Sequence, residues 1–485
     1  MKNKILLMLA MLPLIAGCTG GAYAQGCEKG DIDQFYVDYK QHYYAETDAM
    51  VATGNKKVLI VPLWFNDSET IISDRDTLRD DIRKAYLGTN EETGWRSVRT
   101  FYEEESWGQL HLDGFVTDWY EPNKSHNYYD TSGKTSLCIK DAVNWYKTTY
   151  NDDCKQFDGN GDGYIDAVIM IYAWKNYANA SVATKDNLWA YCFWTNGVAN
   201  PDNPVPVSFF WASYDFMYGT DAGGYGNTAN CILDTHTYIH EMGHILGADD
   251  YYDYANVESP AGAFSMQDYN VGGHDPFSRM AYGWTKPYVP TKNCIIDVQP
   301  FEKNGDLIVL SPKWENSVFD EYIVLELYSP TGVNEFDCTY KYGRSYPQGP
   351  KQCGFRVWHV DARLVYSEGD QFGDAHVTNK IEDGRIYRIA TSNTTYGTDK
   401  ESARGHVSPL STYVYYKQLK LLRKDGEGKF FDESDLFVAG DKFSMSAYKS
   451  QFYKGPKLDT GKNLGWKFEI VSISEQGAQV KVTKA

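Results

Sequence analysis

The sequence contains no CxxC pair, no GxSxG motif, no internal repeat of fixed period and no low-complexity tract. Without a CxxC pair, a cysteine-ligated zinc site is not expected, and without GxSxG the chemistry of a serine hydrolase is not expected either. Basic residues are scarce: 47 Lys and Arg stand against 65 Asp and Glu, which gives a formal net charge of −18. An acidic surface repels phosphate backbones, so nucleic acid is not an expected partner.

Long apolar runs are also missing, except at the N-terminus. There, two lysines precede the apolar run Ile5–Ile15, which is too short to span a bilayer. Residues 1–24 are therefore predicted to be an export signal. Small residues directly before Cys18 favour a lipoprotein-type cut, whose acyl chains would hold the protein on a membrane surface. The alternative is cleavage at the small residues of Ala22–Ala24 by an ordinary signal peptidase. We expect an exported protein: a bacterial cell-envelope lipoprotein by the first cut, a secreted soluble protein by the second.

Eight further cysteines follow Cys18, and an even number in an exported chain permits disulfides. Cys338 and Cys353 bracket a loop that contains Gly and Pro, so they are the expected local pair. The alternative is that several of the eight are free buried thiols.

The length of 485 residues suggests two or three domains, at roughly 100–200 residues per domain. Residues 25–54 are polar and weakly patterned, as in a stem or linker. Over 55–290, apolar runs such as 57–65 and 167–174 alternate with segments of helical spacing, which predicts a mixed domain of helices and strands. Over 291–485, short strand-like runs separated by turn residues predict an all-β sandwich.

The stretch THTYIHEMGHILGADDYYDY, residues 235–254, places His240 and His244 four apart, with Glu241 between them. On a helix, residues four apart share a face, so the two imidazoles can hold one tetrahedral zinc ion. Glu241 can reach water at the metal without being a ligand. This is the HExxH arrangement, in which the glutamate is the general base. The alternative for a bare HExxH is a solvated helix face.

A third ligand is expected just beyond this helix. Gly247 can adopt a left-handed conformation and end the helix, so that the chain turns back toward the histidines. Asp250, six residues after His244, then offers a carboxylate, which is an acceptable zinc ligand beside two imidazoles. Asp249 and Asp253 are the less favoured choices.

With HExxHxxGxxD followed by YYD, the chain resembles the immune inhibitor A-like bacterial metallopeptidases, which are relatives of the metzincins. The segments KVLIVPLWFND, SVRTFYEEESWGQLHLDGFVTDWY, DEYIVLELY and GFRVWHVD are similar to theirs. The resemblance implies a zinc endopeptidase with Asp250 as the third ligand. It also implies that Met266, in FSMQDY, forms the methionine turn beneath the metal; an ordinary core methionine is the alternative. Tyr269, three residues after Met266 rather than two, would correspond to the tyrosine that stabilises an oxyanion in some metzincins.

The stretch FDGNGDGYID, residues 157–166, predicts a second metal site. Alternate positions carry oxygen ligands, and Gly163 supplies the sharp turn of a calcium loop; the ligands are Asp158, Asn160, Asp162, the Tyr164 carbonyl and Asp166. The twelfth position is Ile169 rather than Glu, and a strand follows, so a standard EF-hand is excluded. We predict a structural calcium ion that pins a strand of the catalytic sheet, as the resemblance also implies. The alternative is a metal-free turn.

Three other histidines have simpler interpretations. His236, one turn before His240, is expected to be a surface or packed residue rather than a neighbour of the metal ligands. His274 is expected in a loop, with a place in the substrate cleft as the alternative. His359 lies on a predicted strand, and the alternation of residues there does not decide which face it occupies.

The predicted fold is therefore α+β: a zincin-like catalytic domain over 55–290, followed by an all-β sandwich domain over 291–485. The predicted function is zinc-dependent hydrolysis of peptide bonds in protein or peptide substrates. One rival is a surface lipoprotein that binds glycan or protein, with purely structural metals; its many Tyr and Trp would suit glycan stacking. The other rival is a metal-dependent hydrolase acting on a non-peptide bond. Oligomeric state is not predicted.

Overall fold

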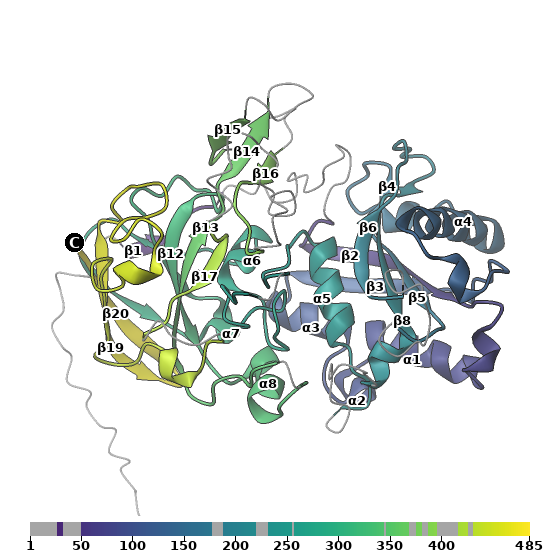
Figure 1. Ribbon diagram of the computed structural model, residues 1–485, viewed down its shortest axis with the longest axis horizontal. Coiled ribbons are helices and arrows are strands. Elements are labelled where there is room, and N and C mark those ends of the chain that lie inside the picture. The colour runs from purple at the N-terminus through teal and green to yellow at the C-terminus, as the bar shows by residue number, and fades with distance from the viewer. Residues whose placement is uncertain are drawn as a thin grey trace, which may run out of the picture.

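The computed structural model (Figure 1) describes residues 27–32, 50–176, 188–219, 231–254, 257–343, 346–367, 375–380, 387–394, 416–424 and 430–485. The predicted export signal, Cys18 included, lies outside these residues. Among the described residues, no helix combines the length and the apolar character that crossing a bilayer requires.

A five-stranded sheet organises the first half of the chain. In spatial order its strands are β3 (Leu110–Val116), β2 (Gly54–Leu63), β5 (Val168–Tyr172), β8 (Ser208–Ser213) and β6 (Tyr191–Trp194). The first four are parallel, and the edge strand β6 runs antiparallel to β8. The central strands β2 and β5 are continuous apolar runs because helices cover both faces of the sheet.

The helices of this half are α1 (Arg75–Leu87), α2 (Asn90–Thr93), α3 (Val98–Glu105), α4 (Ser132–Tyr150), α5 (His236–Ile245) and α6 (Pro276–Ala281). Helices cover both faces of the five-stranded sheet, and α6 lies beside the strands of the second half (Figure 1). Alternate residues of β2 and β5 point into two cores: one shared with α1, α3 and α5, the other with α4. The sheet therefore carries α5 on the face opposite α4. A small two-stranded sheet, β4 (Tyr164–Ile165) and β7 (Val205–Pro206), extends this half.

The second half is dominated by two packed sheets. The six-stranded sheet runs β1 (Cys27–Lys29), β9 (Tyr288–Pro290), β11 (Leu307–Leu310), β12 (Glu321–Tyr328), β13 (Gly354–Asp361), β17 (Leu419–Leu421). The four-stranded sheet runs β10 (Cys294–Val298), β20 (Gly477–Lys484), β19 (Trp466–Ser474), β18 (Lys442–Phe443). A three-stranded sheet, β15 (Ala375–Thr378), β14 (Leu364–Ser367) and β16 (Tyr387–Ile389), and the short helices α7 (Phe301–Asn304) and α8 (Glu335–Thr339) complete it.

The six-stranded sheet is buried on both faces. On β12, Ile323 and Leu325 face the four-stranded sheet, whereas Tyr322 and Val324 belong to the core that contains α3 and α5. One hydrophobic core thus crosses residue 290, the boundary expected from the sequence.

The N-terminal part of the predicted stem over 25–54 has regular structure. Cys27–Lys29 forms β1, which pairs antiparallel with β9, and Cys27 is disulfide-bonded to Cys294. The expected pair Cys338 and Cys353 is wrong, since both are free thiols. A strand of three residues is too short to give a sequence pattern, so β1 was not expected. The disulfide joins two cysteines that the fold brings together, and not the two that are close along the chain.

Candidate metal centre

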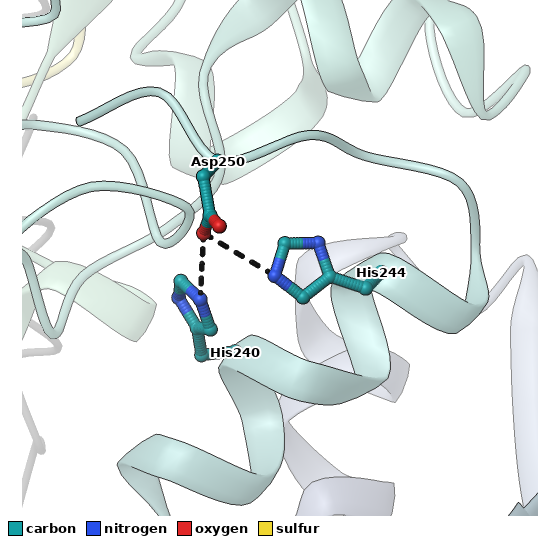
Figure 2. Close-up of side chains that lie close together, drawn as sticks. All are labelled: His240, His244 and Asp250. Atoms are coloured by element: carbon teal, nitrogen blue, oxygen red, sulfur yellow. Dashed lines mark hydrogen bonds and ion pairs between the residues drawn. The ribbon is translucent and has the colours of Figure 1, made fainter. Parts of the chain in front are cut away.

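The structure brings His240, His244 and Asp250 together (Figure 2). The Nε2 atoms of His240 and His244 lie 3.1 and 3.3 Å from the same carboxylate oxygen, Oδ1 of Asp250. One potential ligand atom from each residue lies within 4.8 Å of the other two. Two imidazole nitrogens and one carboxylate oxygen form a donor set that suits zinc.

Local structure explains how a short stretch supplies all three residues. His240 and His244 project from one face of α5, and the chain reverses at Gly247, whose φ of 108° favours glycine. Gly243, a weak helix former, is required inside α5 because a Cβ there would collide with the side chains of Gln267 and His274. The turn after α5 then brings Asp250 back over the two imidazoles.

Backbone carbonyls orient both imidazoles. The Nδ1 atom of His240 lies 2.8 Å from the carbonyl oxygen of Met266, and the Nδ1 atom of His244 lies 2.8 Å from that of Ala248. A carbonyl only accepts, so each Nδ1 carries a proton, and each Nε2 is the nitrogen left to bind a metal once it is deprotonated. Met266 is fully buried, and its own N–H donates to the carbonyl of Gly273. The residue expected at the methionine turn therefore supports His240 through its backbone.

The electrostatics of the three residues are strongly coupled. Burial alone would raise the pKa of Asp250, but contact with His244 and His240 lowers it well below its usual range. Burial alone would lower the pKa of His244, but Asp250 raises it to about 9. The metal-free cluster therefore pairs an anionic carboxylate with an imidazolium, and a dication would bind with release of the Nε2 proton of His244.

Glu241 lies beside the cluster with an unsatisfied oxygen. The residue is 5% exposed, and its Oε2 atom is buried without a hydrogen-bond partner among the described residues. Burial raises the pKa of this carboxyl, while His244 and His240 oppose the rise. A buried carboxyl oxygen without a partner is costly. Its retention next to three potential ligands fits a residue that exchanges protons with a bound reactant.

Tyr254 was not anticipated from the sequence. Its hydroxyl donates to Oδ2 of Asp250 at 2.6 Å, so both oxygens of this carboxylate, the third potential ligand, have a hydrogen-bond partner. The loop between α5 and Tyr254 is irregular, so spacing alone gave no signal for this contact. Asp253, one of the less favoured ligand choices, accepts instead from the backbone N–H groups of Val257 and Glu258.

The ring of Tyr252 connects Tyr269 to His240. The Tyr269 ring packs on Tyr252 with the centroids 5.3 Å apart, and Tyr252 in turn faces His240 at 6.4 Å. A second contact, with Tyr346 at 5.7 Å, holds the other side of the ring. The role predicted for the Tyr269 hydroxyl stays a prediction, and the phenol in direct contact with the cluster is that of Tyr254.

Two of the simpler histidine interpretations are resolved. His236 is a packed residue whose Nε2 lies 2.7 Å from the carbonyl oxygen of Asn270, and burial lowers its pKa to about 3. His274 is fully buried, lies 3.2 Å from the Tyr102 hydroxyl and has its pKa lowered by burial. His274 is therefore a core residue and does not line a cleft.

The predicted calcium loop adopts a tight turn. Asp158 accepts hydrogen bonds from the backbone N–H groups of Gly161 and Gly163 at 2.8 and 2.9 Å, and Gly163 has φ of 89°. Asp162 accepts from the N–H of Tyr164 at 2.8 Å, and the Asn160 amide donates to its other oxygen. The strand expected after the loop is present as β5.

The loop carboxylates are less convergent than the zinc-type triad. Asp166 is 8% exposed, accepts from the N–H of Gly159, and has a pKa raised to about 7 by burial. Among the described residues, the sets of three His, Cys, Asp or Glu whose ligand atoms lie within 4.8 Å of one another do not include this loop. Calcium at this loop therefore stays a prediction.

The comparisons with known proteins point the same way as the triad. No protein-family model matches the chain. The chain is 28% identical over 204 residues to immune inhibitor A of Bacillus thuringiensis subsp. alesti, a match that covers 35% of this chain and 28% of that relative. It is 24% identical over 239 residues to the pre-pro-metalloprotease PrtV of Vibrio cholerae, covering 42% of this chain and 25% of that relative. The matches span about a quarter of these relatives, so part of the chain is distantly related to metalloproteases.

Proposed function

We propose that the protein is a zinc-dependent endopeptidase. The observation that carries the proposal is the convergence of two imidazole Nε2 atoms on one oxygen of Asp250, while both Nδ1 atoms are bonded to backbone carbonyls. The distant similarity to a named metalloprotease supports the same reading. His240, His244 and Asp250 would hold the ion, which fits a site with two imidazoles, one carboxylate and an adjacent glutamate that has one unpartnered oxygen.

In this proposal, a bound zinc ion supplies Lewis acidity, which polarises a substrate carbonyl and makes water acidic enough to attack at neutral pH. Glu241 accepts the proton from the attacking water and then donates it to the leaving amine nitrogen. Burial raises the pKa of Glu241 above its ordinary 4.5, which brings the group closer to the range where one residue can both accept and release a proton. Tyr254 keeps the Asp250 carboxylate in place.

The edge strand β6 supports a polypeptide as the substrate. Its residue Cys192 donates its S–H to the backbone carbonyl of Glu241 at 3.0 Å, so the strand runs directly beside the general base. In the described structure β6 pairs with β8 on one side only. An extended peptide can add to such an edge through main-chain hydrogen bonds. N-methylation of single amides in a cleaved peptide should raise KM at alternate positions; a uniform response would contradict this binding mode.

The decisive experiment replaces Glu241 by Gln. The variant should keep its zinc, measured by elemental analysis, and lose casein hydrolysis by at least about 100-fold, because it lacks the proton acceptor. Glu69→Gln, a change at an exposed position, is the matched control and should leave the rate unchanged. Full activity in Glu241→Gln, or activity that survives removal of zinc by a chelator, would exclude this mechanism.

The two rival functions predict other outcomes of that experiment. A glycan- or protein-binding surface protein would not digest casein with or without zinc. A hydrolase of a non-peptide bond would leave a peptide library intact while still depending on zinc and Glu241. The buried Glu241 favours the peptidase over a binding protein, because binding alone gives no reason to keep an unpartnered carboxyl beside the cluster.

We also propose a zincin-like catalytic domain followed by a β-sandwich, an export signal, and a structural calcium ion. The mixed five-stranded sheet and the two packed β-sheets support the first proposal.

Incorporation of labelled fatty acid into the wild type but not into Cys18→Ala would support the lipoprotein form. Added calcium should raise the thermal midpoint of the wild type but not of Asp158→Asn; equal shifts would exclude the loop as its site.

A further inference from the structure

A second set of potential metal ligands lies in the β-rich half. Glu321 begins β12, His359 lies on the neighbouring β13, and Asp459 precedes β19. The Nε2 atom of His359 lies 2.9 Å from Oε1 of Glu321, and one potential ligand atom from each of the three residues lies within 4.8 Å of the others. The three residues are 2%, 3% and 4% exposed, so this cluster is more deeply buried than surface acidic groups.

We propose that Glu321, His359 and Asp459 bind a second zinc ion, which is structural and fastens the segment before β19 to the six-stranded sheet. One imidazole and two carboxylates are donors that zinc accepts, whereas calcium and magnesium prefer oxygen ligands alone. The site is separate from the candidate catalytic centre, and it uses the strand histidine whose face the sequence left undecided.

A cation would offset the repulsion between the buried carboxylates of Glu321 and Asp459. Asp361, buried next to this cluster, is paired by Arg363 through two contacts of 2.7 and 2.6 Å. The nearby Lys420 donates to the backbone carbonyl of Gln451. His359 is the ion-pair partner of Glu321, whereas Arg363 and Lys420 act on Asp459 at longer range.

An unsatisfied atom points to a ligand at the same place. Oδ1 of Asp459 is buried without a hydrogen-bond partner among the described residues, whereas Glu321 accepts from the backbone N–H groups of Asp459 and Thr460. Leaving a buried carboxylate oxygen unpaired is costly unless something else satisfies it.

The position of the cluster explains what the ion would do. Residues 452–465 make no helix or strand, yet Phe452, Leu458 and Leu464 are buried in the core between the two sheets. A metal cross-link from Asp459 to β12 and β13 would hold this irregular segment in place, as structural zinc sites do in other proteins. The competing explanation is a metal-free ion pair between protonated His359 and the two carboxylates.

Counting bound metal distinguishes the two explanations. Full-length protein is stripped with a chelator and dialysed against Zn²⁺, with excess Ca²⁺ present to occupy the Asp158 loop. The wild type should retain about two zinc ions per chain, and Asp459→Asn and Asp250→Asn about one each. Asp459→Asn should keep its casein hydrolysis and Asp250→Asn should lose it. Asp297→Asn, an exposed position in the same half, is the matched control and should retain both ions.

A wild type whose only ion is lost in Asp250→Asn and kept in Asp459→Asn would overturn the proposal, and so would two ions in Asp459→Asn. If Asp459→Asn does not fold, Asp250→Asn still tests it. That variant should bind one zinc ion, and the ion should raise its thermal midpoint by several degrees. An Asp250→Asn protein that binds no zinc would refute the second site whatever its activity, whereas loss of casein hydrolysis alone bears only on the proposed function.

Discussion

The buried ion pair between Glu105 and Arg279 links stability to the candidate metal centre. Glu105 ends α3 and Arg279 lies on α6; their side chains are 0% and 1% exposed, with Oε1 and Nε 2.8 Å apart. Glu105 also accepts from the backbone N–H of His274 at 2.5 Å. The segment between Met266 and Arg279 is held by this pair, and Met266 orients His240. Weakening the pair should therefore destabilise the support of the centre.

We predict that Arg279→Met destabilises the protein in a pH-dependent way. Burial raises the pKa of Glu105 to about 7, with Arg279 opposing the rise. The folded pKa lies above the ordinary 4.5, so the contribution of Glu105 to stability is complete below pH 4.5 and is lost as pH rises toward 7. Without Arg279 the folded pKa rises further, and the loss continues at about 1.4 kcal/mol per pH unit above pH 7.

The expected magnitude follows from that slope. Near pH 6, Glu105 is mostly protonated in both proteins, so the difference between them reflects packing and the lost contacts of the guanidinium with Phe301 and Trp107. Near pH 9 an additional loss of about 3 kcal/mol has accumulated, which is in the range for removing one partner of a buried ion pair. Methionine is chosen because it fills much of the same space without charge.

Urea unfolding between about pH 6 and pH 9 measures the effect. The gap between wild type and Arg279→Met should widen steadily above pH 7. The double variant Glu105→Gln, Arg279→Met is the control, and its gap to Glu105→Gln should not depend on pH. A gap of constant size in the single variant, or a pH-dependent gap in the double variant, would refute this account of the pair.

Three further perturbations test other contacts. Tyr254→Phe should weaken zinc binding about 10–100-fold, because its hydroxyl fixes Asp250 at 2.6 Å; an unchanged affinity in competition with a chelator would contradict this. Replacing Cys27 and Cys294 by Ser should lower the free energy of unfolding by about 2–5 kcal/mol, because the bond closes a loop of 267 residues. An unchanged midpoint of urea unfolding would contradict this. Burial raises the pKa of Asp337 to about 7, so its stabilising contribution falls as pH rises from 3.8 to about 7. Asp337→Asn should therefore gain stability over the wild type above pH 7 and not near pH 4, as thermal midpoints at the two pH values would test.

Local sequence patterns predicted a large part of the first half. The apolar run 57–65 became β2, the run 167–174 became β5, and the helical spacing between these runs includes α1. The donor triad was also accessible, because two ligands lie on one helix face and Gly247 limits where the chain can turn. These features depend on residue periods of two or 3.6 and on single turns, which can be recognised in a short stretch of sequence.

Contacts between distant segments were beyond such patterns. Cys27 of the six-stranded sheet is bonded to Cys294 of the four-stranded sheet, and Glu105 of α3 contacts Arg279 of α6. His359 lies in a strand whose residues are all buried, so alternation could not assign it a face, and its neighbour Asp459 is 100 residues away along the chain. Each contact requires knowledge of how distant strands, helices and loops pack together, and that information is not local.

The β-rich half also takes part in building the candidate metal centre. The amide of Asn393 donates to the carbonyl of Tyr251 at 2.9 Å, and the hydroxyl of Thr394 accepts from the N–H of Tyr254 at 3.2 Å. Both contacts brace the loop that carries Asp250, and α5 alone supplies only the two histidines. Because a carboxylate ligand on a loop needs its backbone fixed before it can bind metal tightly, the second half is a structural requirement of the centre. The continuous core across residue 290 has the same consequence: the segment 55–290 alone would expose the apolar face that now packs on β12.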